Sequence, residues 1–207
     1  NDDSIPKTQV DAQELILDLL KERAETGRIY IMNIDHCNSH SSFIDKVEMS
    51  NLCQEITLPT KPIQHIDDDS GEIALCILSA INIGKIRDVS DLKSLCDLSV
   101  RSLDELIDFQ GYPVEAAEIA TKARRSLGIG YIGLAHYLAK QGVKYGDPKA
   151  WELVHDLTEA FQYHLIESTV NLAKEKGACE YSDRTKYAQG ILPVSYTHLT
   201  LPTMFEV

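Results

Sequence analysis

The sequence contains 207 residues, 43% of them hydrophobic, which suffices for one large domain or two small ones with an ordinary core. A formal net charge of -12 at pH 7 and a pI near 4.9 argue against a protein that binds nucleic acid through its phosphates, because such binding requires clustered Lys and Arg. No apolar run reaches the roughly 18 to 20 residues that span a bilayer, and the five scattered cysteines lack the spacing of a secreted disulfide framework. We therefore expect a cytoplasmic protein with neither a nucleic-acid nor a membrane partner.

The first expected element is an amphipathic helix between residues 10 and 24. One helical face carries Leu15, Ile16, Leu19 and Leu20. Gly27 supplies the stop of this helix. Residues 28–34, RIYIMNI, alternate in polarity and are rich in branched and aromatic side chains, which predicts a strand leading into the polar loop DHCNSHSS.

Two further extended segments are expected before the chain becomes helical. SNLCQEITLP, residues 50–59, is followed by a turn at Pro59 and Pro62 and then by the acidic loop HIDDDSGE. Residues 72–84, EIALCILSAINIG, form a nearly continuous apolar run, which is the pattern of a strand covered on both faces. Periodicity alone does not separate such a strand from a buried helix.

The remainder of the chain is predicted to form three helices. The first begins at a cap on Asp88 or Ser90, and a second begins near Val114 and continues into AAEIATKARRSL. The third runs from about residue 147 to 176 and ends at Gly177. The apolar stripe of the first helix consists of Val89, Leu92, Leu95, Cys96, Val100, Leu103, Leu106 and Ile107. The inner side of the third consists of Trp151, Val154, Phe161, Leu165 and Leu172.

The segment GIGYIG has the G-x-G-x-x-G spacing of a dinucleotide-binding turn, with glycines at 128, 130 and 133. That motif functions only where it follows a strand and opens a helix, and the residues before it are predicted to be helical. We therefore interpret these glycines as positions of close packing where a helix is bent or broken, beside Arg124 and Arg125.

Two segments have residue types that bind metals. His36, Cys37 and His40 could supply three ligands, but a structural zinc site needs four, and no second Cys or His pair stands at finger-like spacing. Polar loop residues are the favoured interpretation, and a metal-binding structural protein built on these three side chains is the alternative from another functional class. The acidic run 67–69 lacks the spaced ligands of a calcium loop and is interpreted as a solvated turn.

SNLCQEI, residues 50–56, places three polar or reactive groups at every second position. In an extended strand, Asn51, Cys53 and Glu55 would project from one face. A lone strand cysteine, such as Cys76, is usually a small core residue. An amide and a carboxylate beside Cys53 would be costly in a closed core, which predicts that this face meets partners or a ligand.

SNLCQEI, with GRIYIMNIDHCNSH before it, PTKP and GEIALCILSAIN after it, and RRSLGIG followed by YLAKQG, closely resembles the large catalytic subunit of class I ribonucleoside-diphosphate reductases. The resemblance extends from about Asp11 to Pro193. It implies an α/β fold, namely part of a ten-stranded α/β barrel with a cysteine-bearing finger loop and long amphipathic helices. We expect residues 1–193 to form this partial catalytic barrel domain, whereas the tail 194–207 changes character abruptly and is expected not to be native sequence.

The resemblance also implies roles for the residues of the finger loop. Cys53 matches the cysteine that becomes a thiyl radical and abstracts the 3′ hydrogen of a ribonucleotide. Glu55 matches the general base that removes the 3′-hydroxyl proton, and Asn51 matches the amide that holds the sugar. Leu52 and Gln54 would complete the substrate-binding segment. A different class of ribonucleotide reductase is the near alternative, because any thiyl-radical barrel could use Asn-x-Cys-x-Glu.

Cys76 matches one cysteine of the redox-active disulfide, and its partner is absent from this chain. The resemblance implies that the segment binds no cofactor or metal directly. The full enzyme is expected to use a ribonucleoside diphosphate substrate, a metal-radical small (beta) subunit, ATP and dNTP effectors, thioredoxin or glutaredoxin as reductant, and a homodimer of the large subunit. The chain is therefore expected to be a central piece of a longer protein, without turnover by itself, because missing strands leave a barrel open.

Overall fold

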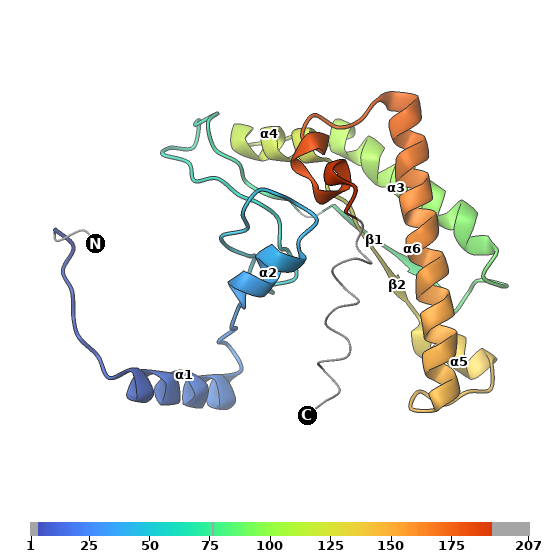
Figure 1. Cartoon of the computed structure of the whole chain (residues 1–207), viewed down its shortest axis with the longest axis horizontal. Helices are drawn as coiled ribbons and strands as arrows, with labels where there is room; N and C mark the ends of the chain where they lie inside the picture. The colour runs from blue at the N-terminus through green and yellow to red at the C-terminus, as the bar shows by residue number, and fades with distance from the viewer. Residues whose placement is uncertain (1–3, 76, 192–207) are drawn as a thin grey trace.

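The computed structural model describes residues 4–75 and 77–191. Its elements in chain order are α1 (Ala12–Thr26), α2 (Ile34–His40), β1 (Leu78–Asn82), α3 (Asp91–Phe109), α4 (Glu115–Arg124), β2 (Gly128–Ile132), α5 (Leu134–Lys140), α6 (Pro148–Lys176) and two 3-10 helices, Ser182–Arg184 and Lys186–Gln189. The helices α3, α5 and α6 gather around the two strands, whereas α1 lies apart at the amino-terminal end (Figure 1). The chain is thus a mixed α/β structure.

The two strands form a parallel pair. Their register runs from Leu78 opposite Gly128 to Asn82 opposite Ile132. A parallel pair needs a crossover connection, and here α3 and α4 provide it. The strand expected at 72–84 is therefore confirmed only in its later part, because β2 supplies a ladder partner only there among the described residues. The second strand was not predicted.

The interpretation of GIGYIG as a broken helix is wrong. Gly128 and Gly130 lie inside β2, and Gly133 is the residue before α5, with φ +82°. The preceding helix α4 ends at Arg124, because Arg125 adopts a left-handed conformation with φ +48°, which is uncommon for a residue other than glycine. The first two glycines lie within the strand rather than in a turn after it, so the segment is not a dinucleotide-binding turn.

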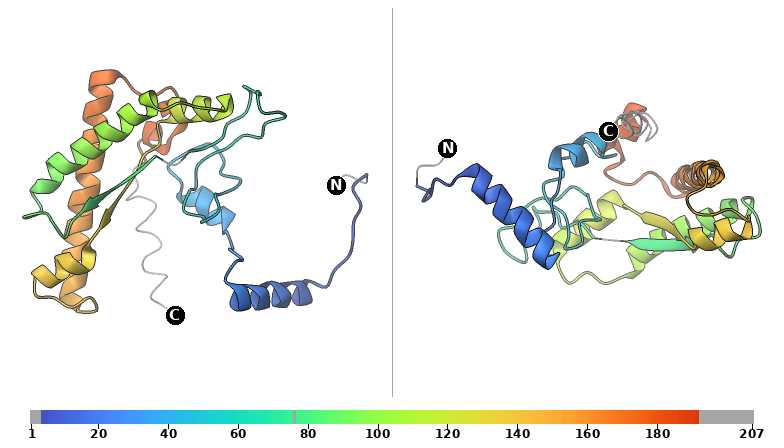
Figure 2. Two further views of the ribbon diagram at one scale, coloured as in Figure 1. Left: turned by 180° about the vertical axis from the view of Figure 1, so that it is seen from behind. Right: turned by 90° about the horizontal axis from the view of Figure 1, so that it is seen from below.

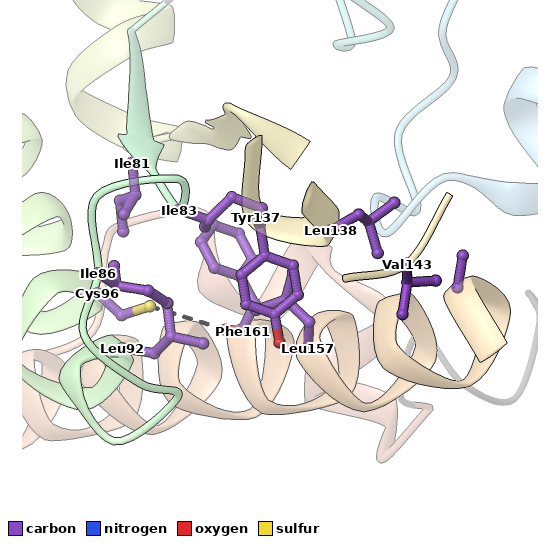
Figure 3. Packing of buried hydrophobic residues seen from close by; sticks show 11 residues of the cluster. Ile81, Ile83, Ile86, Leu92, Cys96, Tyr137, Leu138, Val143, Leu157 and Phe161 are labelled. Atoms are coloured by element: carbon purple, nitrogen blue, oxygen red, sulfur yellow. Dashed lines mark hydrogen bonds between the residues drawn. The ribbon is translucent and has the colours of Figure 1, made fainter. Parts of the chain in front are cut away.

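The main core lies between β1, α3, α5 and α6. Its buried residues are Ile81, Ile83, Ile86, Leu92, Cys96, Tyr137, Leu138, Val143, Ala150, Leu157 and Phe161 (Figure 3). The helices α3 and α6 cross each other beside the strand pair (Figure 2). The apolar stripe predicted for α3 is confirmed in its main part by buried Leu92, Cys96, Val100, Leu103 and Ile107, whereas Leu106 is exposed.

Helix α6 confirms the predicted bounds but not the whole predicted inner face. Phe161 is buried as expected, whereas Trp151 is 69% exposed. The buried positions are Ala150, Leu157, Phe161 and Ser168. The buried stripe includes Ala150 but not Trp151. Adjacent residues of a helix point about 100° apart, so the indole of Trp151 is turned away from the core and faces solvent.

The amino-terminal part contains one confirmed and two wrong predictions. Helix α1 is confirmed with its stop at Gly27, which has a left-handed conformation, but it spans Ala12–Thr26 and so begins and ends two residues later than expected. Its start is fixed by Asp11 Oδ1, which accepts hydrogen bonds from the backbone N–H groups of Gln13 (2.9 Å) and Glu14 (3.0 Å). The predicted strand at 28–34 has no ladder partner and is irregular up to residue 33. The predicted loop after it forms α2 instead.

Among the described helices, none is both long and apolar enough to cross a membrane. Cys76 and the tail 194–207 lie outside the described residues, so the expectations for them stay predictions.

Candidate functional site

The segment SNLCQEI forms a closed loop, and the extended strand predicted for it is wrong. The backbone N–H of Gln54 donates to the carbonyl of Asn51 (3.1 Å), and Gln54 has φ +61°. The hydroxyl of Ser50 donates to the carbonyl of Ile56 (2.6 Å) and so closes the loop across its base. This turn reverses the chain at Leu52 and Cys53, since local side-chain and backbone bonds replace the missing ladder partner.

The turn brings the three predicted reactive residues into one short loop. Asn51, Cys53 and Glu55 are all exposed, and Cys53 is a free thiol. A sulfur in this position is open to a partner molecule, as a cysteine that reacts with a substrate must be. The two other residues of the expected substrate-binding segment differ in burial: Leu52 is 86% exposed, and Gln54 is half-buried.

The side chain of Asn51 has a structural task in this loop. Its Oδ1 accepts a hydrogen bond from the backbone N–H of Ile56 (3.1 Å). The carbonyl end of the amide therefore fixes the loop, and the Nδ2 end is the part that can donate to a ligand.

The base of the loop is held by α2, which the sequence had predicted to be a polar loop. Asn38 Nδ2 donates to the carbonyl of Val47 (2.8 Å), and the Val47 N–H donates to Asn38 Oδ1 (2.8 Å). Val47 and Pro59 are both fully buried on either side of the exposed loop. Sequence reasoning missed Asn38, because nothing in its local pattern marks a bond to a residue nine positions away.

A partly buried ionic cluster lies where the loop-bearing segment meets α4. Arg124 Nη1 donates to Asp45 Oδ2 (2.8 Å), Arg124 Nε donates to Glu72 Oε2 (3.1 Å), and Arg184 Nε lies 2.8 Å from Asp45 Oδ2. Burial raises the pKa of Asp45, but hydrogen bonds and charges from the two arginines outweigh it and leave that pKa below its ordinary value. The sequence feature that could have indicated this cluster is Arg124, a charged residue on a face of α4 that consists mostly of buried alanines.

The polar groups with metal-ligand character do not assemble into a site. His36 and His40 lie one turn apart on α2, where His40 Nδ1 is 3.0 Å from the carbonyl of His36, and Cys37 is half-buried. No three His, Cys, Asp or Glu side chains in residues 4–75 and 77–191 are arranged to hold a metal ion. The structure therefore gives the metal-binding alternative no support.

The acidic run 67–69, predicted to be a solvated turn, is solvated at its two ends but not at its central residue. Asp67 and Asp69 are exposed as expected, but Asp68 is buried and accepts hydrogen bonds from the Ser70 hydroxyl (2.6 Å) and from the backbone N–H groups of Gln64 (2.8 Å) and Ser70 (2.9 Å). The hydroxyl of Ser70 and these N–H groups lower the pKa of Asp68 to about 2. This carboxylate shapes the loop that follows the Cys53 segment.

A small cavity lies beside the ionic cluster. It has a volume of about 10 Å³ and is lined by Leu58, Ala74, Leu75, Ala120, Thr121, Arg124 and Ser126. This volume holds about one water molecule. A nucleotide is far larger, so this cavity does not hold one.

Comparison with known proteins identifies close relatives. Residues 1–201 match the family model "Ribonucleotide reductase, barrel domain". The chain is 58% identical over 196 residues to the ribonucleoside-diphosphate reductase subunit alpha of Haemophilus influenzae, covering 93% of this chain and 26% of that protein. It is 51% identical over 206 residues to the ribonucleoside-diphosphate reductase 1 subunit alpha of Escherichia coli, covering 98% and 27%. With the subunit alpha of Enterobacteria phage T4 the identity is 41% over 200 residues. The chain thus spans about a quarter of the length of these relatives.

Proposed function

Because the chain belongs to the ribonucleotide reductase family, whose barrel domain it matches, we propose that it carries the radical cysteine of a ribonucleoside-diphosphate reductase catalytic subunit. The whole subunit would reduce ribonucleoside diphosphates to deoxyribonucleoside diphosphates. One observation carries the proposal: Cys53 is an exposed free thiol in a closed loop between an amide, Asn51, and a carboxylate, Glu55.

The residues of the loop divide the proposed reaction between them. The Cys53 thiyl radical takes the 3′ hydrogen atom of the ribose, and the same sulfur later returns a hydrogen atom. Glu55 accepts the 3′-hydroxyl proton, for which an ionised carboxylate within hydrogen-bond reach is required. Asn51 Nδ2 would donate to the sugar, while Oδ1 accepts the loop hydrogen bond from Ile56, so the proposed role of Asn51 is positioning.

The remaining electrons would come from a pair of thiols. The 2′-hydroxyl accepts a proton and leaves as water, and two cysteines supply two electrons and two protons as they form a disulfide. Cys76 is proposed as one of the two. Thioredoxin or glutaredoxin would reduce the disulfide again.

We propose the ten-stranded α/β barrel as the complete fold of this domain. The parallel β1–β2 pair with its helical crossover is the unit from which α/β barrels are built. The loop with Cys53 would be its finger loop. The radical would reach Cys53 from a metal-containing small subunit, and the full-length protein would be a cytoplasmic homodimer regulated by ATP and dNTP.

Turnover by variants of the full-length subunit tests the proposal. With the small subunit, a thiol reductant and a ribonucleoside diphosphate, we expect Cys53→Ser to abolish deoxyribonucleotide formation, and Glu55→Gln to reduce kcat about 100-fold or more, as loss of a general base does. Cys37→Ser, which changes a half-buried cysteine on α2, is the matched control and should retain turnover. Turnover by Cys53→Ser would refute the proposal.

The 207-residue chain alone should not turn over substrate. The outer edges of β1 and β2 have no strand partner within the described residues, and the cavity near the loop admits only about one water molecule. Deoxyribonucleotide formation by the purified chain with the small subunit would contradict this expectation.

A further inference from the structure

We propose that Arg124 is a positioning residue for Cys53, because its single guanidinium group joins the two ends of the segment that carries the Cys53 loop. The inference rests on the proposed function of Cys53. It assigns Arg124 no contact with the substrate, only control over where the loop is held.

The two ends of the segment meet at Arg124. Asp45, before the loop, accepts from Arg124 Nη1 at 2.8 Å, and Glu72, after the loop, accepts from Arg124 Nε at 3.1 Å and from Nη2 at 2.5 Å. Glu72 is itself held in register, because its backbone pairs with Lys61 in both directions (2.9 and 3.0 Å). One planar group thus fixes the separation of two points that lie on opposite sides of Cys53 in the sequence.

The Arg124–Glu72 pair is buried and Asp45 is half-buried, which makes this geometry strict. The side chains of Arg124, Glu72 and Asp45 are 5%, 8% and 24% exposed. Water cannot readily replace a lost partner there, and an unpaired buried charge is strongly unfavourable. The fork of an Arg holds two carboxylates at fixed angles, whereas the ammonium of a Lys is a single point of charge.

Arg184 and Tyr181 complete the cluster around Arg124. Arg184 Nε lies 2.8 Å from Asp45 Oδ2, the oxygen that also accepts from Arg124, so two cations face two carboxylates. The ring of Tyr181 lies against both arginines, with its centroid 5.1 Å from Arg124 Cζ and 4.1 Å from Arg184 Cζ. Displacement of either end of the segment would leave at least one of these charges without its partner, which is unfavourable in a partly buried network.

The loop depends on these ends, because its tip has little packing of its own. Leu52 is 86% exposed, and Cys53 and Glu55 are exposed as well. The loop is closed by its own hydrogen bonds, so it moves as a unit when its base moves. A misplacement of about 1 Å at a reacting group costs on the order of 100-fold in rate, which makes the base a determinant of catalysis.

Variants of adjacent arginines in the full-length subunit separate positioning from general stability. Arg124→Gln removes the link between the two ends of the segment. Arg125→Gln is the matched control, because Arg125 is the next residue and also binds two carboxylates, Asp104 and Asp108, but both belong to α3. Backbone hydrogen exchange of residues 46–58 and of α3, resolved by peptide, is measured together with kcat and KM.

We expect Arg124→Gln to speed exchange in residues 46–58 at least about tenfold and to lower kcat about 100-fold with KM changed less than about threefold, since substrate contacts are kept. Arg124→Lys should recover part of both effects. Arg125→Gln should speed exchange in α3 and leave 46–58 unchanged. If Arg124→Gln does not fold, Asp45→Asn, which leaves Glu72 bound, should show the same pattern more weakly.

Unchanged exchange in residues 46–58 for Arg124→Gln, or equal acceleration there in both arginine variants, would overturn the inference. The exchange measurement does not depend on turnover. Failure of the positioning role would therefore leave the proposed function standing, whereas turnover by Cys53→Ser would refute that function and leave the exchange result intact.

Discussion

Alkylation by iodoacetamide should separate Cys96 from Cys53 in the folded 207-residue chain. Cys96 is fully buried in the core between α3 and α6, and this burial raises the pKa of its thiol from 9.0 to about 11. Because the thiolate is the nucleophile, its fraction at about pH 8 falls about 100-fold on folding. We expect Cys96 to react at least about 100 times more slowly in buffer than in concentrated urea, with restricted access slowing it further.

Cys53 provides the internal comparison, because its exposed sulfur is open to the reagent in both conditions. Its rates in buffer and in urea should agree within about threefold. The two cysteines lie in different peptides, so mass spectrometry of timed, quenched samples measures both rates in one experiment. A Cys96 rate in buffer within about tenfold of its rate in urea would refute the assigned core, and protection of Cys53 would refute the exposed loop.

Three further predictions concern stability and are measured by urea unfolding of the chain. Leu92→Ala empties a fully buried position and should lower the free energy of unfolding by about 3 kcal/mol, whereas Leu98→Ala on the exposed face of the same helix should change it by less than about 0.5 kcal/mol. Asp104→Asn should cost about 2 kcal/mol at neutral pH, because Arg125 and Lys176 each lose the most buried of the carboxylates that they bind. Burial raises the pKa of Asp104, but hydrogen bonds from these cations outweigh it and lower that pKa below 3.8. The stabilisation by Asp104 is therefore complete above about pH 4 and is lost as the pH falls. If the free energy of unfolding of Asp104→Asn falls between neutral and acid pH as steeply as that of the unchanged chain, this expectation is refuted. Gly133→Ala should cost about 2 kcal/mol at its positive φ, where a methyl group would also meet a neighbouring amide oxygen, and Gly130→Ala, which has open space, should cost less.

The conformation of the Cys53 loop shows where pattern reasoning reaches its limit. Alternation in SNLCQEI predicts an extended strand, yet the chain turns at Gln54 with φ +61°. A strand is stabilised by a neighbouring strand, and no described segment pairs with this one. The prediction that Asn51, Cys53 and Glu55 lie close together and outside a closed core still holds, because the three residues are only four positions apart and all are exposed.

The sequence by itself determined the long helices and the family. The stop of α1 at Gly27, the limits of α6 and most of the buried stripe of α3 follow from caps and from a repeat of 3.6 residues, both of which act within a few positions of the chain. The ordered motifs around Cys53 indicated the ribonucleotide reductase family, which the match over residues 1–201 shows.

Only the tertiary structure decided which extended segments pair and which charges meet. β1 and β2 pair across a connection that contains two helices, and Arg124 meets Asp45 and Glu72 across separations of 79 and 52 residues. Such contacts depend on how the whole chain closes on itself, because their free energy is gained only once distant segments have been brought together. A local pattern therefore marks a buried Arg as unusual without naming the carboxylates that it binds.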